Sequence, residues 1–283
     1  MIMTCTSAEE LERCVQGFLL EKEAVHNLPL GIMNRLKNEE QVVNQQEEPF
    51  FGYIHEHGQI RAVIMRTPPH MWIVATNEPL PPHNVEEMVC FWRDHHYDVP
   101  GLIGTPDTIY ALANAWNRVT GHAYSIQMNQ KVYQLDEVIL PSKRDGQLVK
   151  AAEEDQLIAK RWIYLFGQEA GIDTSEEDAE KSSVRHIKNG ALHLWIVDGE
   201  PVSMAIQARS TLNGVTINGV YTPDAHKRKG YATSAVAALS QQLLDRGFQF
   251  CSLYTDASNA TSNSIYQKIG YYEVGDSLVI QFP

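Results

Sequence analysis

The sequence predicts an α/β protein built as two similar halves. Its 283 residues suit two domains of ordinary size. Helical and strand-like segments alternate along the chain, and their order in the first half returns in the second. The two predicted hairpin turns contain Gly58 and Gly199, which lie about half the chain length apart. We therefore expect a tandem duplication over residues 1–140 and 141–283, with two unrelated α/β domains as the alternative.

Composition limits the classes of function. Hydrophobic residues make up 43% of the chain and charged residues 20%, as in ordinary globular proteins. The net charge is −12 and neither half carries a basic stripe, so we expect no nucleic-acid partner; an acidic surface suits a cationic amine better than an anion. The sequence contains no run of about 18 apolar residues, so no membrane span is expected. Its start does not resemble a signal peptide.

Cysteines and histidines indicate neither a disulfide framework nor a metal site. Cys5, Cys14, Cys90 and Cys251 show no CxxC spacing, so we interpret them as free thiols in a reducing cytoplasm. The histidines of the first half lack the spacing of zinc ligands. We therefore expect a cytoplasmic protein without a bound metal.

The predicted elements of the first half follow from periodicity and punctuation. Ser7 and Glu10 form a capping-box pattern at the start of the first helix. We expect helices over 7–25, 29–45, 85–95 and 107–119, and strands over 50–55, 59–66, 70–75, 102–104 and 123–138.

The second half repeats this order. Gly247 is expected to end its long amphipathic helix. We expect helices over 145–167, 230–245 and 261–269, and strands over 192–197, 201–209, 215–221, 248–255 and 272–282.

The most informative segment lies between the predicted strand 215–221 and the helix that follows. The first N–H groups of a helix have no internal partners, and the helix dipole favours an anion there. Gly230 would allow phosphate to approach the backbone, and Lys227, Arg228 and Lys229 add positive charge. A solvated basic loop is the alternative. The segment is neither a Walker loop nor a dinucleotide fingerprint.

Two blocks resemble the GNAT superfamily of acetyl-CoA-dependent N-acetyltransferases. Residues 227–232 resemble its [QR]-x-x-G-x-[GA] pyrophosphate loop, with Lys227 where Arg or Gln is usual. Residues 259–271 are similar to its N-x-x-[SA]-x-x-[LI]-Y-x-x-x-G-[FY] block. The clear match covers about 190–283. The resemblance implies two GNAT-like mixed, mostly antiparallel sheets flanked by helices, with acetyl-CoA as cosubstrate.

The resemblance also implies roles for individual residues. Tyr266 would be the general acid that protonates the departing thiolate. Backbone groups at 220–222 would pair with the pantetheine arm, and one N–H there could stabilise the oxyanion. The residues expected to bind the cofactor are Val220, Tyr221, Thr222, Arg228, Lys229, Gly230, Tyr231, Ala232, Thr233 and Asn259.

Each role has a structural alternative. The strand 215–221 could be fully paired, Tyr266 could simply pack in a core, and Asn259 could serve only as a helix cap. No single general base stands out, because the strand 215–221 carries no carboxylate. The candidates are a water route or one of Glu169, Asp198, Glu200 and His193.

The first half lacks the corresponding blocks. Residues 76–84 contain no glycine and no Lys or Arg, and Trp116 and Asn117 stand where the Asn and Tyr pair would be expected. We expect a degenerate copy without acetyl-CoA that supports the second domain and shapes the acceptor site.

The leading hypothesis is an N-acetyltransferase in which an amine attacks acetyl-CoA directly in a ternary complex. The alternatives are an acetyl-CoA or CoA sensor without turnover, and a scaffold in which both halves have lost the ligand. The sequence specifies neither the amine acceptor nor the oligomeric state.

Overall fold

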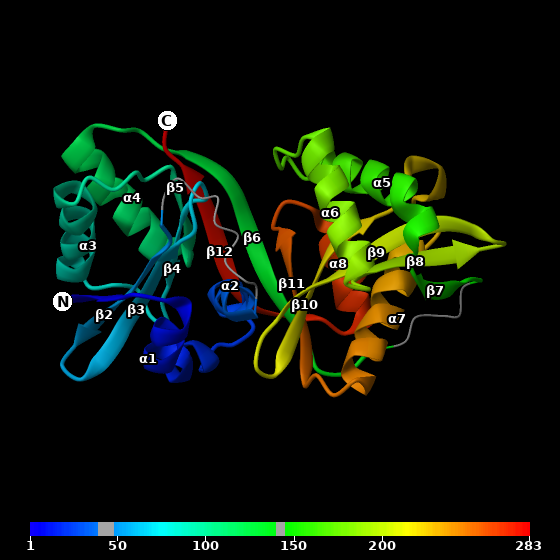
Figure 1. The fold of residues 1–283 in the computed structure, drawn as a ribbon, viewed down its shortest axis with the longest axis horizontal. Coiled ribbons are helices and arrows are strands. Elements are labelled where there is room, and N and C mark those ends of the chain that lie inside the picture. Colours follow the sequence, from blue (N-terminus) through cyan, green and yellow to red (C-terminus); the bar gives the residue numbers. More distant parts are fainter. Residues whose placement is uncertain (39–47, 140–144) are drawn as a thin grey trace. The chain divides into compact units, whose positions relative to one another are not determined.

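The computed structural model describes residues 1–38, 48–139 and 145–283, and these divide into two compact units (Figure 1). The first unit contains residues 1–132, 254–258 and 273–283, and the second contains residues 133–253 and 259–272. The predicted boundary at Leu140 and Pro141 lies outside the described residues.

Six strands in the order β1-β2-β3-β4-β5-β12 form the sheet of the first unit. β4 and β5 are parallel, and the other pairs of described register are antiparallel. Two apolar clusters bring α3 and α4 against one set of strand residues and α1 and α2 against another. The elements are β1 (Ile2–Cys5), α1 (Ala8–Leu20), α2 (Asn27–Asn38), β2 (Phe50–Glu56), β3 (Gln59–Arg66), β4 (Trp72–Ala75), α3 (Pro82–Asp94), β5 (Gly101–Gly104), α4 (Pro106–Thr120) and β12 (Tyr272–Gln281).

The second unit repeats this plan with the strand order β7-β8-β9-β10-β11-β6. β10 and β11 are parallel. α7 and α8 pack in one apolar cluster, and α5 and α6 in another. Its elements are β7 (Gln147–Lys150), η1 (Glu153–Asp155), α5 (Gln156–Glu169), α6 (Glu176–Lys188), β8 (Leu192–Val197), β9 (Glu200–Ser210), β10 (Gly214–Tyr221), η2 (Asp224–His226), α7 (Tyr231–Asp245) and α8 (Ala260–Ile269), with β6 (Ser125–Leu135) and β11 (Phe250–Asp256) divided between the units.

The two repeats exchange their last strands. β6 follows α4 in the chain but lies next to β11, while β12 follows α8 and pairs with β5. Residues 273–283 therefore belong to the first unit, although the predicted division placed them in the second domain. Leu278 and Ile280 are fully buried in the same apolar cluster as Leu102, which is the physical reason for this placement.

Local signals predicted most elements well. Ser7 caps α1 by accepting from the Glu10 N–H at 3.1 Å, whereas the Glu10 carboxylate accepts from the Thr6 N–H. Both predicted hairpin turns occur, and each contains a glycine with positive φ. Gly247 follows the end of α7 in the left-handed region, as expected.

One stretch of the second unit differs from the prediction. Residues 145–155, expected to begin a helix, instead form the edge strand β7 and the short η1, because β7 pairs antiparallel with β8. α6 was not predicted from the sequence either. A capping box between Ser175 and Asp178 marks the start of this polar helix and was a readable signal.

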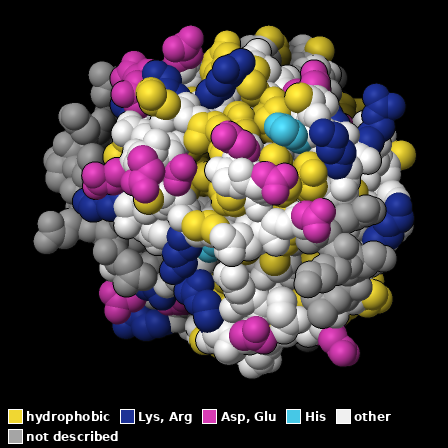
Figure 2. Space-filling model, turned by 90° about the vertical axis from the view of Figure 1, so that its right-hand side faces the viewer, with side chains coloured by type: hydrophobic (Ala, Val, Ile, Leu, Met, Phe, Trp, Pro, Cys, Tyr) yellow, Lys and Arg dark blue, Asp and Glu magenta, His cyan; other side chains and the backbone are white. Residues whose placement is uncertain are grey.

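None of the helices in the described ranges combines the length and the apolar character that a membrane crossing requires. On the face drawn in Figure 2, lysine and arginine side chains are interspersed with acidic ones rather than gathered in a stripe.

Candidate functional site

β10 pairs with its parallel neighbour over only part of its length. The register with β11 runs from Gly214–Phe250 to Thr216–Ser252, and the last pair is joined by their side-chain hydroxyls at 3.1 Å. β10 itself continues to Tyr221 and remains in register with β9. Residues 217–221 of β10 thus have no described pairing with β11.

A β-bulge reshapes this end of β10. Between Asn218 and Tyr221 the strand holds one residue more than the facing segment of β9. Gly219 has φ +57°, a backbone conformation that favours glycine, and a Cβ there would lie 2.7 Å from the end of the Ile206 side chain, which would have to shift. A bulge re-aims the backbone groups that follow it. Gly219 was not among the residues predicted to shape the site, although a glycine inside a strand pattern signals a bulge.

A buried serine on β9 holds the end of β10. Ser203 Oγ lies 3.1 Å from the Tyr221 carbonyl and 2.8 Å from the Thr222 hydroxyl. The Tyr221 ring packs against Trp162, and burial raises the pKa of its phenol. These contacts hold the Tyr221 carbonyl, the Tyr221 ring and the Thr222 hydroxyl within the second unit. Cofactor binding by the backbone of residues 220–222 stays a prediction.

The loop after β10 leads into an open helix N-terminus. It passes through η2, takes a left-handed conformation at Arg228 (φ +62°), and reaches the N-cap Gly230 at φ +82°. Gly230 provides no side-chain cap, and the first turn of α7 contains no acidic residue. The first N–H groups of α7 therefore have the arrangement that favours an anion.

The three cations of this loop have different surroundings. Lys227 Nζ donates to both oxygens of Glu169 at 3.0 and 3.1 Å and lies 2.8 Å from Asp224 Oδ1. The hydrogen bond to Asp224, followed by the one to Glu169, raises the pKa of the Lys227 ammonium. Arg228 and Lys229 are exposed, and neither forms an ion pair with any residue that the structure describes.

Asn259 occupies the N-cap of α8. Its Oδ1 accepts from the Ser262 N–H at 3.0 Å, so the capping role considered for this residue is present in the structure. The side-chain amide retains two N–H donors for a ligand. Capping and cofactor binding are therefore compatible at this position.

Tyr266 is 8% exposed and lies among aromatic neighbours. Its ring centroid is 5.9 Å from that of Tyr271 and 6.4 Å from that of Tyr133. Val220, at the bulge of β10, packs against the same apolar cluster. Burial raises the pKa of Tyr266 to about 12, so the phenol stays protonated at neutral pH. That is the state required of a proton donor.

The candidate bases have different environments. The Glu169 carboxylate is engaged by Lys227. Asp198 and Glu200 are exposed at the β8–β9 turn, as expected of solvated carboxylates. His193 is buried, and burial lowers the pKa of its imidazole. The structure therefore does not single out one of these four residues as the general base.

Cys251 is a core residue rather than a nucleophile. It is fully buried, its Sγ lies 3.7 Å from the Ser240 carbonyl, and burial raises its pKa to about 12. A thiol with such a pKa carries almost no thiolate at neutral pH. All four cysteines are free, as the sequence analysis expected.

The corresponding place in the first unit is closed. The β4–β5 register extends to Val74–Gly104, the last residue of β5, so these strands stay paired to their end. The cavity beside that end has a volume of about 30 Å³, room for roughly two or three water molecules. Pro81 is the N-cap of α3 and Pro82 follows it, and a proline has no backbone N–H for an anion.

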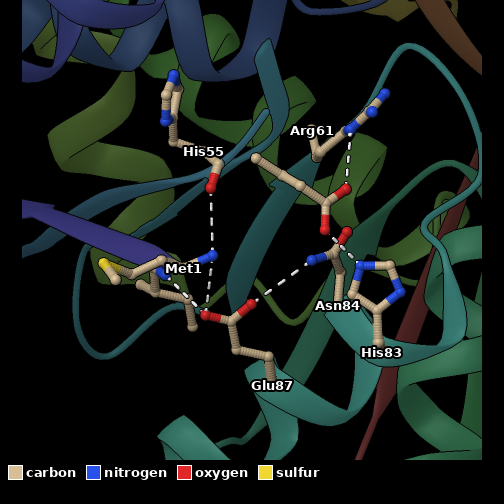
Figure 3. A network of polar contacts seen from close by, with 8 residues as sticks. Met1, His55, Arg61, His83, Asn84 and Glu87 are labelled. Carbon is tan, nitrogen blue, oxygen red and sulfur yellow. Dashed lines mark hydrogen bonds and ion pairs between the residues drawn. The ribbon is translucent and has the colours of Figure 1, made fainter. Parts of the chain in front are cut away.

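The first turns of α3 are also occupied by contacts within the first unit (Figure 3). The Glu87 carboxylate accepts from the Ile2 N–H at 2.9 Å and from the Asn84 amide at 3.5 Å. His83 binds Glu56, which also forms an ion pair with Arg61 at 3.3 Å. The start of this helix therefore carries an internal polar network where α7 carries an open loop.

Comparisons with known proteins agree with this architecture. Residues 194–279 match the FR47-like protein family model. A solved structure of a Drosophila protein is 11% identical with a TM-score of 0.70, covering 100% of this chain and 98% of its own. A GCN5-related N-acetyltransferase from Sphaerobacter thermophilus is 11% identical with a TM-score of 0.66, covering 100% of this chain and 95% of its own.

A further similar structure is described as a tandem GNAT protein from the clavulanic acid biosynthesis pathway. It is 11% identical with a TM-score of 0.54, and the alignment covers 100% of this chain and 98% of that one. A search of curated protein sequences gives no significant match. Residues 194–279 are therefore similar to the FR47-like family, and the whole chain shares its fold with GNAT proteins of known structure.

Proposed function

We propose that the second unit is an N-acetyltransferase that binds acetyl-CoA and transfers its acetyl group to an amine. The GNAT fold and the FR47-like match support an acyltransferase role. The cosubstrate and the amine acceptor are our assignment. In this proposal the first unit carries no acetyl-CoA.

One continuous segment, residues 217–233, carries the proposal. It contains the part of β10 beyond its described parallel register, the bulge at Gly219, the basic loop and the open start of α7. A strand edge without a protein partner can pair with an extended amide-bearing chain such as pantetheine. A helix N-terminus with nearby cations suits a pyrophosphate.

The reaction uses few groups. Backbone groups at Val220, Tyr221 and Thr222 bind the pantetheine amides and stabilise the oxyanion of the tetrahedral intermediate. The amine nitrogen forms a bond to the thioester carbon, and the carbon–sulfur bond then breaks. Tyr266 donates its hydrogen bond or proton to the departing sulfur. The amine must also lose its proton. Glu169 is held in an ion pair with Lys227, and a water route, Asp198, Glu200 and His193 are the other candidate acceptors of that proton.

The first test is calorimetric titration with acetyl-CoA of the wild-type protein, Gly230→Leu and Gly199→Leu. The two glycines have nearly equal φ values of +82° and +84°, so both substitutions introduce similar backbone strain. Gly199 lies at an exposed turn with open space around its Cα. We expect one site per chain, weakened at least about tenfold only by Gly230→Leu, because its side chain blocks the backbone approach. A folded wild-type protein that binds no acetyl-CoA would refute the proposal.

The same protein could hold acetyl-CoA without turning it over. The ion pair between Glu169 and Lys227 favours this sensor alternative, because it occupies one of the candidate bases. Acetyl transfer to a panel of primary amines distinguishes the two, because the sensor binds acetyl-CoA but yields no acetylated amine.

A further inference from the structure

Lys227 stands at the first position of the basic loop, where its resemblance to the pyrophosphate loop would make it a phosphate-binding cation. In the structure its ammonium already has two acidic partners. Three oxygens of Glu169 and Asp224 lie 2.8–3.1 Å from Nζ. We call these three residues the clasp.

The clasp joins separate elements of the second unit. Glu169 is the last residue of α5, Asp224 begins η2, and Lys227 directly follows η2. The contact thus ties the loop before α7 to a helix that precedes it by about 60 residues. The next residue, Arg228, has a positive φ, which is uncommon for a residue other than glycine. The loop therefore has a specific backbone conformation that the ion pairs of Lys227 can stabilise.

The charges of the loop are divided accordingly. Two carboxylates surround the single ammonium of Lys227, so the clasp has no positive charge left for a phosphate. Arg228 and Lys229 are exposed, and among the described residues neither has an ion-pair partner. Their charges are therefore not offset by an ion-pair partner among the described residues.

We propose that Lys227 is a positioning residue: it holds the loop in its ligand-ready shape through Glu169 and Asp224, while Arg228 and Lys229 supply the charge that attracts the phosphates of acetyl-CoA. This inference rests on the proposed function for its ligand. The expected effect is modest, because the Lys227 and Glu169 side chains are 40% and 50% exposed and water screens their ion pair.

The test compares Lys227→Met, Glu169→Gln and the double variant by acetyl-CoA titration and by hydrogen exchange of the unliganded loop 222–233. We expect each single variant to weaken binding by about two- to fivefold, the range of a partly exposed ion pair, and to speed exchange in the loop. The double variant should be no weaker than the singles, because both changes break the same contact. Lys227→Arg should keep both properties, since a guanidinium also binds two carboxylates.

Arg228→Gln and Lys229→Gln are the matched controls. They should weaken acetyl-CoA binding without changing hydrogen exchange in the loop, because they remove charge and leave the ion pairs of Lys227 intact. If Lys227 were itself a phosphate ligand, Glu169→Gln would release it and tighten binding, which would overturn the inference. A wild-type protein that fails to bind acetyl-CoA would refute the proposed function instead. The exchange measurement would then still report whether the clasp orders the loop.

Discussion

At the scale of single residues, the phenol of Tyr266 is protonated at neutral pH, as a proton donor must be, but it holds its proton more tightly than a thiol does. Its pKa is raised to about 12 by burial, whereas an alkyl thiol has a pKa of about 8.5. Complete proton transfer from this phenol to a thiolate would be uphill by about 5 kcal/mol. We therefore expect Tyr266 to stabilise the departing sulfur mainly by donating a hydrogen bond.

Tyr266→Phe tests this role. The substitution preserves the ring that packs between Tyr133 and Tyr271 and removes only the hydroxyl. We expect kcat for acetyl transfer to fall about 10²-fold or less, at the low end of general-acid effects, with acetyl-CoA affinity unchanged. Steady-state kinetics and calorimetry measure the two quantities. An unchanged kcat would assign Tyr266 to packing alone.

Arg228 has an unusual backbone conformation for a residue other than glycine. A non-glycine residue at φ +62° costs roughly 1–2 kcal/mol relative to the right-handed region. Arg228→Gly and Arg228→Ala both remove the cation, but only glycine relieves the strain. We expect both variants to weaken acetyl-CoA binding equally, with the glycine variant more stable to urea by about 1 kcal/mol. Equal stabilities would show that the left-handed backbone is not strained.

At the scale of elements, α6 carries a histidine that couples its folding to pH. Burial lowers the pKa of His186 to about 4, and the charge of Arg185 adds to the shift. In the unfolded chain the imidazole titrates near pH 6.5. Between about pH 6.5 and pH 4 the unfolded state binds the proton more strongly, so the free energy of unfolding falls as the pH drops.

Urea unfolding at several pH values measures this slope. His186→Gln should make the decline between pH 6.5 and pH 4 shallower without abolishing it, because burial also lowers the pKa of His193. The same substitution at the exposed His122 is the control and should leave the slope as it is in the wild type. A slope unaffected by His186→Gln would contradict the assignment.

The elements also show how far local signals reach. The helix start at Ser7, the hairpin turns and the stop at Gly247 were all predictable, because capping and turn chemistry depend on neighbouring residues. β7 was predicted as helix, since its pairing with β8 involves residues that are distant in sequence. The polar α6 was missed, although its capping box was readable from Ser175 and Asp178.

At the scale of the whole molecule, the exchange of the last strands assigns β12 to the first unit. Ile280 is fully buried and faces Leu102 of β5 in the sheet register. Ile280→Ala should lower the free energy of unfolding of the first unit by about 2–5 kcal/mol, through lost burial and the cavity left behind. Hydrogen exchange should then speed up in β4 and β5.

Val279→Ala is the matched control for that experiment. Val279 precedes Ile280 on β12 and is only partly buried, so its truncation should cost less. If Ile280→Ala instead loosened β10 and α7 while β4 and β5 kept their protection, β12 would belong to the second unit in solution, as the simple division at residue 140 implies.

Periodicity, turn glycines and short motifs are local properties of a chain, so they were enough to predict the α/β class and the tandem plan and to single out residues 227–232 as a candidate phosphate loop. The folded structure was needed to show that the repeats exchange their last strands, that Gly219 makes a bulge, and that Lys227 binds Glu169 and Asp224. These features depend on contacts between residues far apart in sequence. Such contacts form because buried apolar strands and opposite charges find partners in space, and a single sequence does not reveal which partner each will find.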